Sequence, residues 1–137
     1  MPVVRDFRFL GWPDRGAVPF TSATKWSAVN FLDRGAYVVG APEYILGQDF
    51  AALEKRTAPY AAQGCRVLLL AQCDGAEIGR LHGVVIPLAL LVLENPIRPN
   101  APKVFDYFHT QGVDVKVISG DNPVTVSAVA AQAGIQN

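Results

Sequence analysis

The sequence predicts a mixed α/β fold made of two successive domains. Short β-type segments separated by turns fill residues 1–83, whereas strand and helix patterns alternate over residues 84–137. The chain of 137 residues is 50% hydrophobic and 18% charged, with 12 basic and 12 acidic side chains. This composition excludes a disordered chain, and the balanced charge excludes a strongly basic module that binds nucleic acid.

The first domain is expected to contain a hairpin, which is an antiparallel pair of strands. Residues 26–31 have a strand-like pattern, residues 33–35 have the composition of a turn, and residues 36–39 resume a strand. Pro42 then begins a short helical turn, because the first helical position does not use the N–H group that proline lacks.

A longer helix is expected from Asp49 toward residue 63. Asp49 is a suitable N-cap, and Gly64 is a suitable residue to end the helix. Pro59 should split or kink this helix, because it removes a backbone donor. Residues 66–71, with the sequence RVLLLA, follow as a largely buried strand.

The second domain is expected to begin with a strand of a parallel sheet. Residues 88–93 are continuously apolar, which is typical of a strand covered on both faces. Three prolines make residues 94–102 a loop, because proline cannot join the interior of a sheet. A helix over residues 102–111 and a further strand over residues 115–118 are predicted to follow.

The last predicted helix has clear boundaries. Asn122 is a natural N-cap, Pro123 suits the first helical position, and Gly134 suits the end of the helix. With the preceding elements this helix completes a βαβα unit, in which one helix crosses over between two parallel strands.

Three residues before this helix are candidates for handling a phosphoryl group. Ser119, Gly120 and Asp121 lie where the predicted strand ends and the helix begins. Open α/β sheets bind ligands at this edge, and the N–H groups of a helix N-terminus favour anions. An ordinary turn, in which the polar residues only cap the helix, is the alternative.

A second candidate cluster in the first domain consists of Phe20, Lys25 and Arg66. An aromatic face can stack on a nucleotide base, and lysine and arginine can neutralise phosphate charge. The alternative is that Phe20 belongs to the core and Lys25 is a solvated strand residue.

No metal site is expected in this sequence. Cys65 and Cys73 lack the spacing of a metal-binding pair, so we expect free, buried thiols. His82 and His109 have no acidic or cysteine partner at ligand spacing, so we expect ordinary structural or surface residues.

Five motifs in series resemble the cytoplasmic region of P-type cation-transporting ATPases, over residues 19 to 135. The motifs are PFTSATKWSAV at 19–29, GAPEYIL at 40–46, GCRVLLLA at 64–71, LENPIRP at 93–99 and VKVISGDNPVTVSAVAAQAGI at 115–135. The resemblance implies the C-terminal part of an antiparallel nucleotide-binding domain over residues 1–83. It also implies the start of a phosphorylation domain over residues 84–137, with the parallel sheet of the haloacid dehalogenase (HAD) fold.

The resemblance also implies roles for the candidate residues. Phe20 would stack on the adenine of ATP, Lys25 would lie near the nucleotide, and Arg66 would reach its phosphates. Gly40 of the GAPE motif would belong to the same nucleotide site. The hydroxyl group of Ser119, where the family usually has threonine, would bind the transferred phosphoryl group beside Gly120 and Asp121.

Two departures from the family pattern affect this expectation. Val39 stands where the family commonly has lysine, and Asn95 replaces the aspartate of the hinge motif. The DKTGT segment, whose aspartate accepts the phosphoryl group, and the GDGxND segment, whose aspartate helps to hold Mg²⁺, do not occur. We therefore expect the magnesium ligands and the phosphorylated aspartate to lie outside this chain.

The resemblance identifies the chain as a fragment of a pump at the cytoplasmic face of the cell membrane. That pump would couple ATP hydrolysis, through an aspartyl-phosphate, to transport of calcium or magnesium by membrane helices outside this chain. Its partners would be ATP and the remaining pump domains. The alternative is a catalytically inactive nucleotide-binding or interaction module. A small dehalogenase-type phosphatase is disfavoured, because the nucleophilic aspartate motif is missing.

Overall fold

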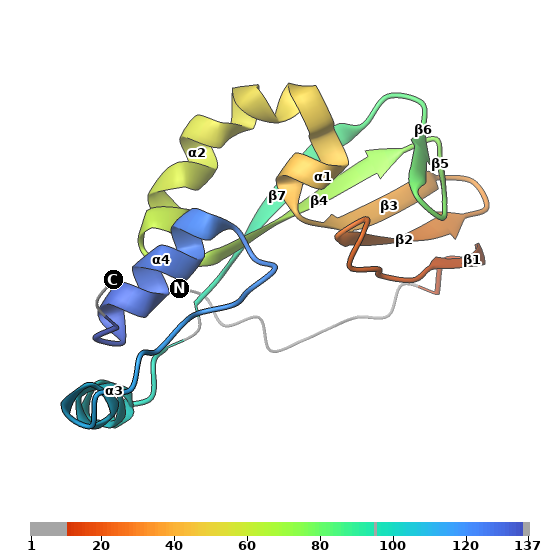
Figure 1. The fold of residues 1–137 in the computed structure, drawn as a ribbon. Helices are drawn as coiled ribbons and strands as arrows, with labels where there is room; N and C mark the ends of the chain where they lie inside the picture. The colour runs from red at the N-terminus through yellow and green to blue at the C-terminus, as the bar shows by residue number, and fades with distance from the viewer. Residues whose placement is uncertain (1–10, 95, 136–137) are drawn as a thin grey trace.

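The computed structural model describes residues 11–94 and 96–135, which fold around one antiparallel sheet (Figure 1). The sheet has five strands in the order β1-β2-β3-β4-β7, and every neighbouring pair is antiparallel. The strands are β1 (Asp14–Val18), β2 (Trp26–Phe31), β3 (Gly35–Gly40), β4 (Arg66–Cys73) and β7 (Ile86–Leu93). The mixed α/β class and the antiparallel first part are thus confirmed.

The predicted hairpin is formed by β2 and β3. Its register pairs Trp26 with Gly40 at one end and Phe31 with Gly35 at the other. Gly35 has a left-handed φ of +69°, and a Cβ atom added to it would lie 2.3 Å from the Cys73 carbonyl oxygen. Glycine is therefore required at this turn, both for the backbone conformation and for the close approach of β4.

Helices α1 (Pro42–Leu46) and α2 (Ala51–Ala62) lie across one face of the sheet, joined by the 3₁₀ turn η1 (Gly47–Phe50) (Figure 1). Pro42 begins α1 as predicted. The assignment of Asp49 as an N-cap is wrong, because Asp49 lies inside η1 and the helix begins after it. Pro59 lies within α2 and does not split it.

The core lies between these helices and the sheet. Leu69 and Val38 are the largest fully buried side chains of the described residues, and Trp26 and Ile45 pack in the same cluster. Because alternate residues of a strand point to opposite faces, the buried positions of β2, β3 and β4 recur at every second residue.

A small hairpin of β5 (Gly75–Glu77) and β6 (Arg80–His82), which the sequence pattern did not predict, packs beside the sheet. The Asn30 side chain fixes it, donating to the Ala76 carbonyl at 2.9 Å and accepting from the Ala76 N–H at 2.8 Å. His82 Nε2 lies 3.1 Å from the Glu77 carboxylate.

Both cysteines are free and buried, as predicted. The Cys73 thiol donates to the Gly75 carbonyl at 3.3 Å. Burial raises the pKa of this thiol, because the low-polarity surroundings disfavour the thiolate. Cys73 is therefore a packing residue with a protonated side chain at neutral pH.

The parallel unit expected in the second domain is not formed by the described residues. β7 pairs antiparallel with β4 and extends the first sheet, and its side chains are largely exposed. The predicted parallel strand covered on both faces is therefore wrong. Residues 115–118 form no strand, because no neighbouring strand of the described residues pairs with them.

The helices of the second part are confirmed as α3 (Ala101–Thr110) and α4 (Pro123–Gln132). α4 packs on α2, and two side chains hold it: Thr125 Oγ1 donates to the Cys65 carbonyl at 3.2 Å, and Gln132 Nε2 donates to the Gln63 carbonyl at 3.0 Å. α3 lies beyond α4, away from the sheet (Figure 1). None of the helices in the described ranges has the length and apolar character needed to cross a membrane.

Candidate functional site

Lys25 is placed by a tight turn that follows Phe20. Thr21 closes this turn, because its Oγ1 accepts from the Thr24 N–H at 3.0 Å and its carbonyl accepts from the Lys25 N–H at 2.9 Å. Lys25 adopts a left-handed φ of 59°, which is the only positive φ among the described residues other than glycine. The turn therefore holds the lysine in a conformation that its side chain does not favour.

The end of β3 passes so close to Lys25 that only glycine fits there. A Cβ atom on Gly40 would lie 2.3 Å from the Lys25 carbonyl oxygen and 2.5 Å from Trp26 Cα. The Ala41 N–H donates to the same carbonyl at 2.9 Å, which ties the start of α1 to the turn. Gly40 thus positions Lys25 by close packing.

Arg66 and Asp121 form an ion pair between residues that are far apart in sequence. The Arg66 guanidinium donates to the Asp121 carboxylate, and the side chains are 56% and 46% exposed. Arg66 begins β4, while Asp121 lies in the turn that leads into α4. Asn122 caps α4 as predicted, because its Oδ1 accepts from the Val124 N–H at 2.9 Å.

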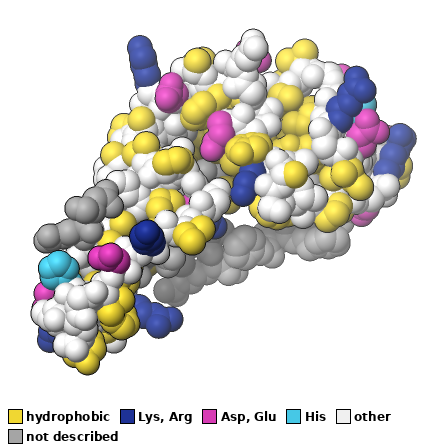
Figure 2. Space-filling model, viewed as in Figure 1, with side chains coloured by type: hydrophobic (Ala, Val, Ile, Leu, Met, Phe, Trp, Pro, Cys, Tyr) yellow, Lys and Arg dark blue, Asp and Glu magenta, His cyan; other side chains and the backbone are white. Residues whose placement is uncertain are grey.

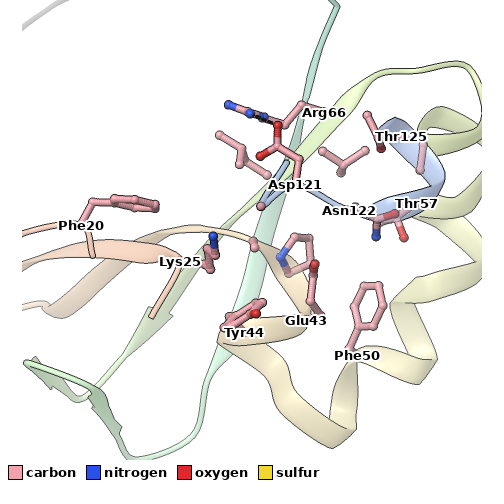
Figure 3. Close-up of a pocket in the computed structure, with 16 residues that line it drawn as sticks. Phe20, Lys25, Glu43, Tyr44, Phe50, Thr57, Arg66, Asp121, Asn122 and Thr125 are labelled. Atoms are coloured by element: carbon pink, nitrogen blue, oxygen red, sulfur yellow. Dashed lines mark hydrogen bonds and ion pairs between the residues drawn. The ribbon is translucent and has the colours of Figure 1, made fainter. Parts of the chain in front are cut away.

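These residues surround a cavity of about 170 Å³ between the sheet, α1, α2 and the start of α4 (Figure 3). Phe20 and Lys25 stand on one side of it in Figure 3, and Asn122 and Thr125 stand on the other. The charged side chains of its lining balance, because Lys25 and Arg66 are matched by Glu43 and Asp121. Phe20 lines the cavity and is 60% exposed, so its aromatic ring can stack on a planar ligand.

Most of the residues selected from the sequence line this one cavity. Phe20, Lys25, Arg66, Gly120 and Asp121 do so, although the sequence had suggested two separate clusters. Two others do not line it. Gly40 packs behind Lys25, and the Ser119 hydroxyl faces its own turn, where it accepts from the Asp121 N–H at 3.2 Å.

Several lining residues were not predicted as site residues. Glu43 and Tyr44 of α1 and Thr57 of α2 line the cavity, and Tyr44 is 50% exposed. For Glu43 and Tyr44 the signal was present, because both belong to the GAPEYIL motif. Thr57 carried no such signal, since it lies in an otherwise ordinary helix and its hydroxyl donates to the Glu54 carbonyl.

Of the two departures from the family pattern, the structure describes Val39 only. Val39 lies on the face of β3 opposite the buried core and does not line the cavity. The absence of a lysine at this position therefore removes no cation from the cavity lining. Asn95 lies outside the described residues.

The described residues offer no metal centre. No group of three or more histidine, cysteine, aspartate or glutamate side chains within residues 11–94 and 96–135 is arranged to hold an ion. One oxygen of the Asp121 carboxylate, Oδ2, is engaged by Arg66.

Comparison with known proteins finds cation-transporting ATPases that are similar to this chain. The chain is 50% identical over 127 residues to the calcium-transporting ATPase CtpE of Mycobacterium tuberculosis, which covers 91% of this chain and 16% of that protein. It is 40% identical over 134 residues to the probable cation-transporting ATPase exp7 of Streptococcus pneumoniae, covering 93% of this chain and 17% of that protein. The chain is homologous to one segment of P-type cation-transporting ATPases.

More distant members of the same group also match. The chain is 30% identical over 131 residues to the ATP-binding subunit of a potassium-transporting ATPase from Leptospira interrogans, covering 88% of this chain and 17% of that protein. No family model matches the chain. The chain spans only 16–17% of the length of these relatives.

Four of the five sequence motifs converge on the cavity. Residues 19–29, 40–46, 64–71 and 115–135 each contribute lining residues, although they are spread over more than a hundred positions of the 137-residue chain. The fifth motif, residues 93–99, follows β7, and its described residues do not line this cavity.

Proposed function

We propose that this chain binds ATP as one segment of a larger P-type pump. That pump couples ATP hydrolysis, through an aspartyl-phosphate, to cation transport across a membrane. The observation that carries the proposal is the convergence of Phe20, Lys25 and Arg66 on one cavity that also meets the segment from Gly120 to Asp121. An exposed ring and two cations suit a nucleotide, which has a planar base and a chain of anionic phosphates.

Each residue has a distinct role in this proposal. Phe20 stacks on the adenine ring, while Lys25 and Arg66 bind the phosphates. Gly40 belongs to the nucleotide site through its packing against Lys25, which sets the position of the ammonium group. Tyr44 adds a second exposed aromatic ring at the cavity.

The segment from Ser119 to Asp121 is proposed to belong to the phosphorylation domain. Ser119 and Gly120 would contact the transferred phosphoryl group with Asp121, once the rest of the pump supplies the phosphorylated aspartate and Mg²⁺. The residues described here do not fit a magnesium centre, so no catalytic step is assigned to the ion. The pairing of β7 with β4 favours a domain junction in the loop that follows Leu93, rather than at residue 83.

Calcium is the cation we propose for the pump, because relatives named as calcium-transporting are 46–50% identical to this chain. The other domains of the pump would be its partners, and the segment would work at the cytoplasmic face of the membrane, where ATP is available. None of the cavity residues takes part in ion selection in this proposal.

Calorimetric titration of the chain with ATP tests the nucleotide site. We expect Phe20→Ala to weaken binding about five- to 150-fold, because stacking on a base contributes about 1–3 kcal/mol. Arg66→Ala should weaken binding roughly tenfold, since it removes a charged hydrogen-bond donor from the phosphates.

Two matched variants control for loss of an exposed ring or an exposed cation. Phe108→Ala on α3 and Arg80→Ala on β6 alter side chains that do not line the cavity, and both should bind ATP as the unmodified chain does. The assignment would be wrong if Phe20→Ala and Arg66→Ala also left the affinity unchanged.

A further inference from the structure

Asp121 and its neighbours lie against both cations that the proposed function assigns to nucleotide phosphates. The Asp121 carboxylate accepts from the Arg66 guanidinium. Gly120 lies beside the second cation, because a Cβ atom built on it would be 3.0 Å from Lys25 Nζ. The same short turn therefore meets both positive charges of the cavity.

This turn is held in place by a helix that is itself tethered. The Asp121 N–H donates to Ser119 Oγ, and Asn122 caps the first turn of α4. Thr125 and Gln132 then bind α4 to the carbonyl groups of Cys65 and Gln63, directly before β4. Arg66 directly follows Cys65 in the chain. The hydrogen bonds that anchor α4 therefore also hold the Asp121 carboxylate next to the Arg66 guanidinium.

The cavity is open to solvent, because Phe20 and Tyr44 in its lining are 60% and 50% exposed. Within it, the Asp121 carboxylate occupies donors of Arg66 that the proposed function assigns to a phosphate. A phosphate bound at Arg66 must therefore take these donors from the carboxylate.

The geometry points to Asp121 as an internal substitute for a nucleotide phosphate. A carboxylate and a phosphate present similar anionic oxygens to a guanidinium, so both compete for the same donors of Arg66. Asp121 thus occupies the donors of Arg66 in this phosphate subsite, and a nucleotide phosphate must displace it from them. This inference rests on the proposed function, because it assumes that Arg66 binds phosphate.

The inference predicts that removing the carboxylate charge tightens nucleotide binding. In Asp121→Asn the side chain keeps its size and an oxygen acceptor, but the charge attraction for Arg66 is lost. We expect the affinity for ATP to rise about two- to five-fold, which is the range for an exposed ion pair. Adenosine has no phosphates and does not need Arg66, so its affinity should remain unchanged.

The experiment is a calorimetric titration of the full chain with ATP and, separately, with adenosine. Asp114→Asn is the matched control, because it removes an exposed carboxylate that does not line the cavity. Circular dichroism and the unfolding midpoint check that each variant is folded. A gain for ATP alone, in Asp121→Asn alone, supports the inference.

A double-mutant cycle separates competition for Arg66 from simple charge repulsion. With Arg66→Ala already present, Asp121→Asn should give no gain in ATP affinity, because the guanidinium for which the carboxylate and the phosphate compete is absent. An equal gain in both backgrounds would show repulsion only and would overturn the inference.

The outcomes also distinguish this inference from the proposed function. If Phe20 and Arg66 are needed for ATP binding but Asp121→Asn does not strengthen it, only the competitive role of Asp121 fails. If neither the unmodified chain nor Asp121→Asn binds ATP, the nucleotide site itself is wrong, and the inference falls with it.

Discussion

The sheet region, residues 11–93, and the region that follows it, residues 96–135, differ in how they bury apolar side chains. Every buried apolar side chain of the described residues lies in the sheet region, with the exception of Ala133. In α3 no residue is buried, and its Val104 and Phe108 side chains are 42% and 38% exposed. Figure 2 accordingly shows apolar side chains at the surface of the end of the molecule that carries α3.

The difference teaches what an apolar pattern does and does not determine. The stripe of Val104, Phe105 and Phe108 predicts which face of α3 favours burial, and this prediction follows from helical spacing alone. Burial itself needs an opposing surface, which the sheet region has in α1 and α2. The two regions should therefore respond differently to the same kind of substitution.

The largest contrast is expected between two apolar truncations. Leu69→Ala should lower the free energy of unfolding by about 2–5 kcal/mol, because it removes a fully buried side chain and leaves a cavity. Phe108→Ala should lower it by less than about 1 kcal/mol, because Phe108 is 38% exposed and lies outside the buried core cluster. Urea unfolding followed by circular dichroism measures both, and equal losses would show that α3 is packed as firmly as β4.

A smaller effect is expected at the start of α4. Asn122→Ala removes the cap on the Val124 N–H and should destabilise α4 by about 1 kcal/mol. Hydrogen exchange should report faster exchange in α4, with the amides of β3 and β4 unchanged. Ser127→Ala, at an exposed position of the same helix, is the control and should not accelerate exchange. Faster exchange throughout the sheet would show that the cap of α4 also stabilises the sheet region.

The elements that could be predicted from sequence have local causes. The β2–β3 hairpin follows from a turn with glycine, and α4 follows from Asn122, Pro123 and Gly134 at its ends. The partner of β7 could not be predicted, because a continuous apolar run does not specify the direction of the neighbouring strand. The Asp49 prediction failed because a capping residue also suits the 3₁₀ turn that precedes α2.

In the candidate site, too, the sequence predicted local features better than contacts between distant residues. The chemistry of Phe20, Lys25 and Arg66 suggested a nucleotide, and the structure places all three at one cavity. The pairing of Arg66 with Asp121 joins positions 55 residues apart and depends on the docking of α4, which no local pattern encodes. Sequence analysis therefore identified the components of the cavity better than the contacts among them.

The backbone of Lys25 links the stability of the chain to its proposed chemistry. The left-handed conformation of this residue costs a side chain about 1–2 kcal/mol, whereas glycine adopts it freely. Lys25→Gly should therefore raise the free energy of unfolding by about 0.5–1 kcal/mol after the greater chain entropy of glycine is counted, while weakening ATP binding. The control is Lys55→Gly within α2, which should instead lower the free energy of unfolding by about 1 kcal/mol. A lower free energy of unfolding in both variants would show that the turn at Lys25 is unstrained. Selecting this chain for heat resistance alone would thus favour replacing Lys25 by glycine and losing the cation that we propose for the nucleotide site.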